Sequence, residues 1–199
     1  MAYNDFDLKT AIETFSLTED RDADLFSEVA PIEPSPSLRD LLEEFAPVAL
    51  ATNTEKARSE FIIVPFLIEW KRRSRSSLNI LSGIALDVDR SRGLTGFCDY
   101  LISRSDGYHY LKAPLIAVVE AKREDVYGGF GQCVAEMVAI RLFNERDQVS
   151  LPVIYGCVTS GNIWRFLKLE GSALTIDKPE YYLGDPGKLL GVLVHISAG

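Results

Sequence analysis

The chain has 199 residues, 47% of them hydrophobic and 10% aromatic, so it is long and apolar enough to bury the core of one domain. Its formal net charge of -8 argues against a protein that coats nucleic acid by bulk electrostatics, because such affinity comes mainly from Lys and Arg. No apolar run approaches the ~18 residues of a membrane span, and the first residues lack the features of a signal peptide. We therefore expect a cytoplasmic protein without membrane association.

Three cysteines, Cys98, Cys133 and Cys157, are far apart in the sequence and form no Cys-x-x-Cys spacing. This pattern argues against a disulfide framework and against a structural zinc site. We expect three small buried side chains in a reducing compartment.

The first 37 residues are rich in acidic side chains, and Pro31, Pro34 and Pro36 interrupt the end of this stretch. Closely spaced prolines break regular structure and are typical of linkers. We predict an acidic N-terminal appendage and proline-rich linker over residues 1–37, followed by one domain over residues 38–199.

Two capping-box patterns, at residues 37–40 and 52–55, predict helices at the start of this domain. Pro65 lies within the second helical stretch and removes a backbone donor, so we expect a kink or a helix boundary there. That stretch ends in a basic cluster, for which a solvated helix end is the simplest interpretation. A phosphate backbone could also dock on this cluster, which consists of Lys71, Arg72, Arg73 and Arg75.

Beyond this cluster the hydrophobic period changes to that of strands. Residues 78–88 and 94–103 predict two strands, Asp106-Gly107 predicts a tight turn, and residues 114–119 form a continuous apolar run typical of a strand covered on both faces. We expect this last strand to be central in its sheet. The rest of the chain predicts a helix over 132–143, a hairpin of 153–158 with 163–169, and a short helix over 186–196. This order favours an α/β (α+β) protein with a central mixed sheet and helices packed on both faces.

The candidate chemistry lies at the end of the apolar strand. Alternate residues of a strand face the same side, so Glu120 and Lys122 project together. Asp99, on the preceding strand, is the ionisable member of the face it shares with Phe97 and Leu101. If the two strands are neighbours, a carboxylate from each reaches one hard cation, which prefers oxygen ligands. The alternative is a surface ion pair between Glu120 and Lys122.

Three short motifs carry a resemblance to a known family. Gly96-Phe97-Cys98-Asp99, then Val118-Val119-Glu120-Ala121-Lys122, and then Gly131-Gln132 resemble the PD-(D/E)XK, or restriction-endonuclease-like, superfamily of nucleases. The order of elements extends the resemblance over about residues 52–168. Cys98 stands where a proline often precedes the first acidic residue, which makes the motif less specific.

The resemblance implies a restriction-endonuclease-like core that hydrolyses phosphodiesters, with Asp99 and Glu120 holding Mg²⁺, for which Mn²⁺ can substitute. It also implies that Lys122 lies near the attacking water. Burial would lower the pKa of Lys122, but we expect the two neighbouring carboxylates to have the larger effect and to favour its charged form. Gln132 would orient water or contact a phosphate, although a polar residue at a helix start is an equally good interpretation. Residues 54–60 resemble a helix in the nuclease domain of type I restriction motor subunits, which would add Glu60 to the metal site.

The sequence therefore favours a metal-dependent nuclease that acts on DNA rather than RNA, alone or as a homodimer or part of a larger assembly. Its nucleic-acid-binding residues would be the basic cluster together with Arg123. An alternative is a non-catalytic PD-(D/E)XK-like module that binds a partner or nucleic acid, which the overall acidity favours. A small-molecule acid/base enzyme is less well supported, because neither His109 nor His195 is near the motif in the sequence.

Overall fold

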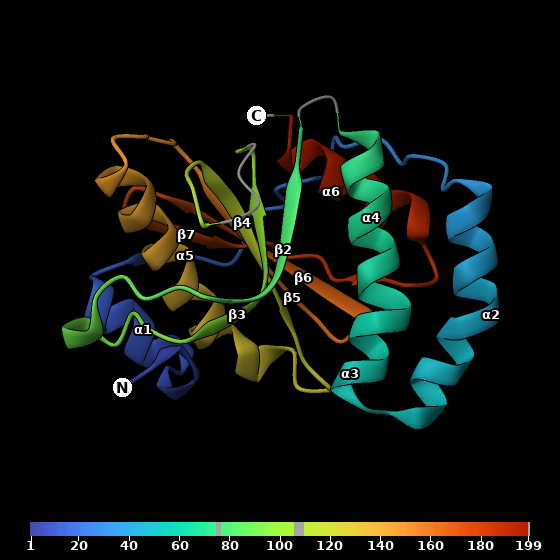
Figure 1. Ribbon diagram of the computed structural model, residues 1–199, viewed down its shortest axis with the longest axis horizontal. Helices are drawn as coiled ribbons and strands as arrows, with labels where there is room; N and C mark the ends of the chain where they lie inside the picture. The colour runs from blue at the N-terminus through green and yellow to red at the C-terminus, as the bar shows by residue number, and fades with distance from the viewer. Residues whose placement is uncertain (75–76, 106–109, 199) are drawn as a thin grey trace.

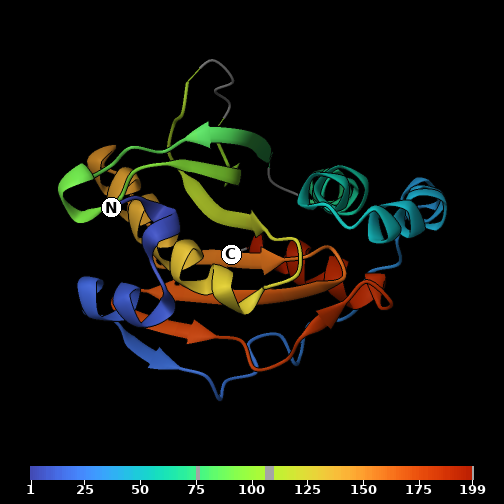
Figure 2. The ribbon, with the colours of Figure 1, turned by 90° about the horizontal axis from the view of Figure 1, so that it is seen from below.

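In the computed structural model, the described residues (1–74, 77–105 and 110–198) form an eight-stranded mixed sheet with helices on both faces (Figures 1 and 2). The elements, in chain order, are η1 (Tyr3–Asp5), α1 (Leu8–Phe15), β1 (Thr18–Asp20), α2 (Pro36–Thr52), α3 (Glu55–Arg58), the π-helix η2 (Ser59–Ile63), α4 (Val64–Arg73), β2 (Asn79–Ala85), η3 (Arg90–Arg92), β3 (Phe97–Ser103), β4 (Leu115–Ala121), η4 (Tyr127–Gly129), α5 (Phe130–Arg146), β5 (Ile154–Thr159), β6 (Ile163–Glu170), β7 (Ala173–Ile176), β8 (Tyr181–Tyr182) and α6 (Pro186–Ile196).

The strands follow the order β1-β7-β6-β5-β4-β3-β2, with β8 paired to β6. β2, β3 and β4 are antiparallel neighbours, and β5 runs parallel to β4 after the crossover through α5. β6 is antiparallel to β5. Every residue of β4 is buried, which confirms the prediction of a central strand. The predicted turn at Asp106-Gly107 lies outside the described residues.

Two hydrophobic layers pack on the sheet. On one face, α5 covers residues such as Leu101, Val118 and Val158, and α1 packs on α5. On the other face, α4 and α6 belong to the apolar layer that contains Ile102 and Val119, and α2 packs on η2 and α4 at its outer side. Because side chains alternate along each strand, one apolar run supplies both layers, and this explains why β4 lacks a polar face. In the part of the chain that the structure describes, no helix has both the length and the apolar character needed to span a bilayer.

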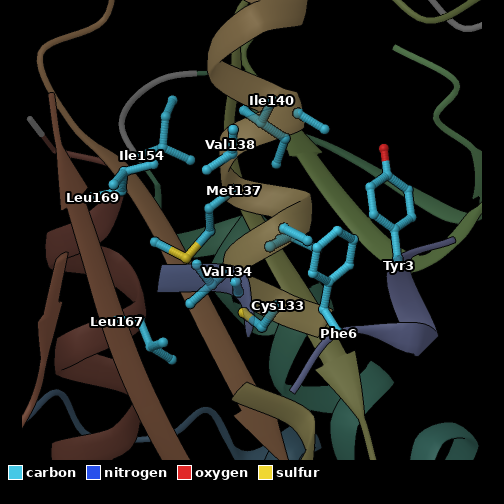
Figure 3. Close-up of a cluster of buried hydrophobic side chains, with 14 of the residues drawn as sticks. Tyr3, Phe6, Cys133, Val134, Met137, Val138, Ile140, Ile154, Leu167 and Leu169 are labelled. Carbon is cyan, nitrogen blue, oxygen red and sulfur yellow. The ribbon is translucent and has the colours of Figure 1, made fainter. Parts of the chain in front are cut away.

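The first 37 residues differ from the expected appendage, because they belong to the same packed unit. Tyr3 and Phe6 are 1% and 3% exposed and lie against α5 (Figure 3). A Cβ at Gly131 of α5 would come within 2.2 Å of the Asp7 carbonyl carbon, so the two backbones are in close contact. β1 extends the sheet as a parallel neighbour of β7. The acidic composition concealed these contacts, since a few buried aromatic residues are enough to anchor such a segment.

Both predicted capping boxes are displaced by two residues. The Ser35 hydroxyl accepts a hydrogen bond from the Leu38 N–H, so the cap of α2 precedes the predicted one at Ser37. Likewise Thr54, rather than Thr52, caps α3, because α2 continues through Thr52 and ends at Asn53 in the left-handed conformation. Pro65 lies in the first turn of α4, directly after the π-helix η2, so the helix type changes there while the backbone remains helical.

Candidate active site

The antiparallel register of β3 and β4 brings Asp99 beside Glu120. Tyr100 pairs with Val119, so the next position along places Asp99 across from Glu120. The Ala121 N–H donates a hydrogen bond to Asp99 Oδ2 at 2.8 Å, so the Asp99 carboxylate is held against the end of β4. The backbone N–H of Lys122 donates to the Thr159 carbonyl at 2.8 Å, which fixes the start of the following loop on β5.

Lys122 completes the group that the sequence predicted. Its Nζ donates hydrogen bonds to Glu120 Oε1 at 2.7 Å and to Gln132 Oε1 at 2.9 Å. The Lys122 side chain is 25% exposed and that of Glu120 is 4% exposed, so this is a largely buried ion pair rather than the surface pair considered above. The structure thus brings Asp99, Glu120, Lys122 and Gln132 together.

Burial and charge act in opposite directions on this group. Loss of hydration, followed by the repulsion of Asp99, raises the pKa of Glu120 to about 7, although Lys122 opposes this shift. Burial lowers the pKa of Lys122, but its attraction to Glu120 outweighs that effect and leaves the pKa raised. The ammonium form of Lys122 is therefore favoured, as expected. Glu120 Oε2 is buried and has no hydrogen-bond partner.

A further residue, Glu136, belongs to the group and was missed in the sequence. Gln132 Nε2 donates a hydrogen bond to Glu136 Oε1 at 3.1 Å. Glu136 is fully buried, and this burial, with the charge of Glu120, raises its pKa well above its ordinary value. The available signal was its spacing: positions i and i+4 share a helix face, so a Glu four residues after Gln132 faces the same strand ends.

Glu60 lies on another side of Asp99. Both residues line a cavity of about 310 Å³ between η2 and the strands, together with Glu55, Lys56 and Ala121. Glu60 forms an ion pair with Lys56 at 2.9 Å, and the Glu60 side chain is 51% exposed. Arg58, 8% exposed, donates to the Ser160 carbonyl at 2.8 Å and thereby holds this helical segment against the end of β5.

The basic residues nominated for nucleic-acid binding do not gather at this site. Lys71, Arg72 and Arg73 lie in the last turn of α4, whereas the cavity lies at the first. Val64 lines the cavity, and Lys71 to Arg73 follow it by seven to nine residues, which corresponds to about 10–14 Å along the helix axis. Arg73 also binds the buried carboxylate of Glu69 at 2.8 Å. Arg123 is exposed next to Lys122, and Arg75 lies outside the described residues.

Over the described ranges, no group of three or more His, Cys, Asp or Glu side chains is placed to hold a metal ion. Asp99 and Glu120 supply two carboxylates, a set that suits Mg²⁺, which usually takes one or two carboxylates and retains several waters. The unpartnered, buried Glu120 Oε2 and the repulsion between the two carboxylates also fit a bound cation.

The fold and these residues define a mixed α/β protein with an acidic pair and a lysine at the adjoining ends of two central strands. Comparisons with models of protein families, with curated proteins and with solved structures found no match for this chain.

Proposed function

We propose that this protein is a metal-dependent nuclease with a restriction-endonuclease-like core of the PD-(D/E)XK type. The observation that carries the proposal is the buried, unpartnered oxygen of Glu120 beside Asp99, with the Lys122 ammonium bound to the other oxygen of the same carboxylate. The order β2, β3, β4, α5 and β5 supports it, because the motif residues fall on β3, at the end of β4 and on α5.

Asp99 and Glu120 would hold Mg²⁺ or Mn²⁺ in this proposal. The Ala121 N–H fixes one Asp99 oxygen, which keeps that carboxylate at the strand end. When bound, the metal polarises a phosphoryl oxygen, lowers the pKa of water and offsets developing negative charge. Glu60 lines the cavity on the other side of Asp99 and is a candidate for a further ligand.

Lys122 would stabilise the charge that develops on the phosphoryl group. Its raised pKa keeps a proton on Nζ, so the group donates hydrogen bonds rather than removing a proton from water. Gln132 accepts one of those hydrogen bonds and is itself held by Glu136, so the two residues of α5 position the ammonium. DNA is the preferred substrate in this proposal.

A non-catalytic binding module is the second candidate. The net charge of -8 and the distance of Lys71, Arg72 and Arg73 from the site favour it, because a nuclease must attract a polyanion. In that case the ion pair of Lys122 with Glu120 would serve packing alone.

A cleavage assay with a matched control separates the two candidates. Lys168 is 26% exposed and pairs with Glu170, as Lys122 is 25% exposed and pairs with Glu120, so Lys168→Ala controls for the loss of a lysine ion pair. With Mn²⁺ and single- or double-stranded DNA and RNA, we expect cleavage by the wild type and by Lys168→Ala, and none with chelator. Lys122→Ala should cleave about 10²–10³-fold more slowly.

Calorimetric titration with Mn²⁺ adds a second measurement. Lys122→Ala removes a charge but no oxygen ligand, so it should still bind Mn²⁺, whereas Asp99→Asn should lose both binding and cleavage. Absence of cleavage of every substrate by the wild type would leave the non-catalytic module as the better interpretation.

A further inference from the structure

Two exposed tyrosines lie together at the surface and share one carboxylate. The Tyr127 and Tyr182 side chains are 56% and 49% exposed. The Tyr127 hydroxyl donates to Glu180 Oε1 and the Tyr182 hydroxyl donates to Glu180 Oε2. Both rings are therefore held at their polar ends, and each side chain remains about half exposed.

A buried cation supports one of these rings from below. The Arg165 guanidinium is 7% exposed and lies 5.2 Å from the Tyr127 ring centre and 5.5 Å from that of Phe130. Arg165 donates to the Tyr127 hydroxyl at 2.9 Å and to the Asp177 carbonyl at 2.8 Å. Tyr127 is thus ordered before any ligand arrives, which lowers the entropy lost on binding.

These tyrosines adjoin the candidate active site. Tyr127 is the first residue of η4 and Gly129 is the last. A Cβ added at Gly129 would lie 3.0 Å from Lys122 Cε, so η4 packs closely against the Lys122 side chain. Tyr182 pairs with Ile163 at the start of β6, at the same end of the sheet as Thr159, the last residue of β5. Thr159 pairs with Ala121, the residue before Lys122. The two rings and the Lys122 ammonium therefore lie at one end of the sheet.

We propose that Tyr127 and Tyr182 form a stacking site for unpaired nucleobases, so that the substrate is single-stranded nucleic acid. Each base has a flat aromatic face, and stacking on a protein ring is worth about 1–3 kcal/mol per base whatever the sequence. In a duplex these faces are covered by neighbouring bases. Arg165 and Glu180 offset each other in charge at 3.5 Å, so this surface selects for bases rather than for phosphates. The assignment of the ligand as nucleic acid rests on the proposed nuclease function.

Binding can be measured without metal and therefore without cleavage. We suggest fluorescence anisotropy in the presence of chelator with a labelled oligothymidylate, an oligouridylate, an abasic DNA strand of equal length and a duplex. The double variant Tyr127→Leu with Tyr182→Leu removes both rings, whereas the corresponding double Phe variant keeps them. Tyr110→Leu is the control, because Tyr110 is 70% exposed and lies in the β3–β4 connection, at the other end of β4 from Lys122.

The Leu variant should bind oligothymidylate at least about tenfold more weakly than the wild type, as should the wild type with the abasic strand. The Phe variant and Tyr110→Leu should retain most of the affinity, and the duplex should bind weakly. Comparison of oligouridylate with oligothymidylate shows whether RNA or DNA is preferred. Equal affinity of the Leu variant and the wild type, or of the abasic strand and oligothymidylate, would overturn the stacking site.

The same variants distinguish this inference from the proposed function. Ring-dependent binding without any cleavage would refute the nuclease and leave the stacking site in place. Cleavage of single strands by the Leu variant at the wild-type rate would refute the stacking site and leave the nuclease in place.

Discussion

Lys122 Nζ lies 2.7 Å from Glu120 Oε1, while the other oxygen of that carboxylate is buried without a hydrogen-bond partner. An ion pair that satisfies half of a buried carboxylate is an incomplete arrangement for packing alone, since an unsatisfied buried acceptor is destabilising by about 1–3 kcal/mol. Asp99, held by the Ala121 N–H, adds a second carboxylate to the same strand end. This relationship also governs how the metal-free protein responds to pH.

The metal-free protein should lose stability as the pH rises from about 4.5 towards 7. Glu120 has a pKa of about 7 in the folded state against an ordinary 4.5, so the folded state binds this proton more tightly than the unfolded state does. The stabilisation from the proton on Glu120 is therefore complete below a pH of about 4.5, the ordinary pKa, and is lost as the pH rises through about 7, the pKa in the folded state. Glu136, whose pKa is also raised, acts in the same direction. Urea unfolding across this range measures the effect.

Glu120→Gln provides the control, because it keeps the shape of the side chain and cannot titrate. Its free energy of unfolding should fall less steeply with pH than that of the wild type. An identical pH dependence in the two proteins would show that Glu120 has an ordinary pKa in the folded state.

Arg123→Glu should weaken binding of nucleic acid and reduce the slope of log affinity against log salt by about one. Arg123 is exposed directly after Lys122. Arg72→Glu should have little effect, because Arg72 lies about 12 Å along α4 from Val64, which lines the cavity, and this exceeds the screening length of about 10 Å at 0.1 M salt. Anisotropy at several salt concentrations tests both variants. The reverse result would place the nucleic acid on the last turn of α4.

Phe6→Ala should lower the free energy of unfolding by about 3–5 kcal/mol, because Phe6 is 3% exposed in the core beneath α5. Lys9→Ala is the matched control in the same segment, since the Lys9 side chain is 83% exposed, and it should change stability by less than about 0.5 kcal/mol. Chemical denaturation measures both. An unchanged main transition in Phe6→Ala would indicate that the first 37 residues are a separate appendage after all.

Thr54→Ala should destabilise the protein by about 1 kcal/mol, because the Thr54 hydroxyl accepts a hydrogen bond from the Ala57 N–H at 3.1 Å at the start of α3. Thr52→Ala, two residues earlier, replaces the last residue of α2 and removes no cap, so its effect should be close to zero. Thermal unfolding of the two variants compares the observed cap with the capping box that the sequence indicated. Equal losses would refute this assignment.

The sequence by itself determined the local features of the site. The two-residue period of a strand places Glu120 and Lys122 together, and a continuous apolar run identifies β4 as the central strand. Asp99 could be predicted as their partner because neighbouring segments of the chain commonly form neighbouring strands. These features depend on residues close in sequence, so the pattern of side chains contains them.

Only the tertiary structure decided the contacts between distant segments. The N-terminal residues pack on α5 because Phe6 and Tyr3 fit between that helix and the sheet, a fit that their acidic neighbours do not reveal. Glu180 meets Tyr127 through the pairing of β8 with β6, and α4 places Arg72 at the end of the helix remote from Asp99. Such contacts arise from the packing of whole elements, whose mutual placement no local spacing specifies.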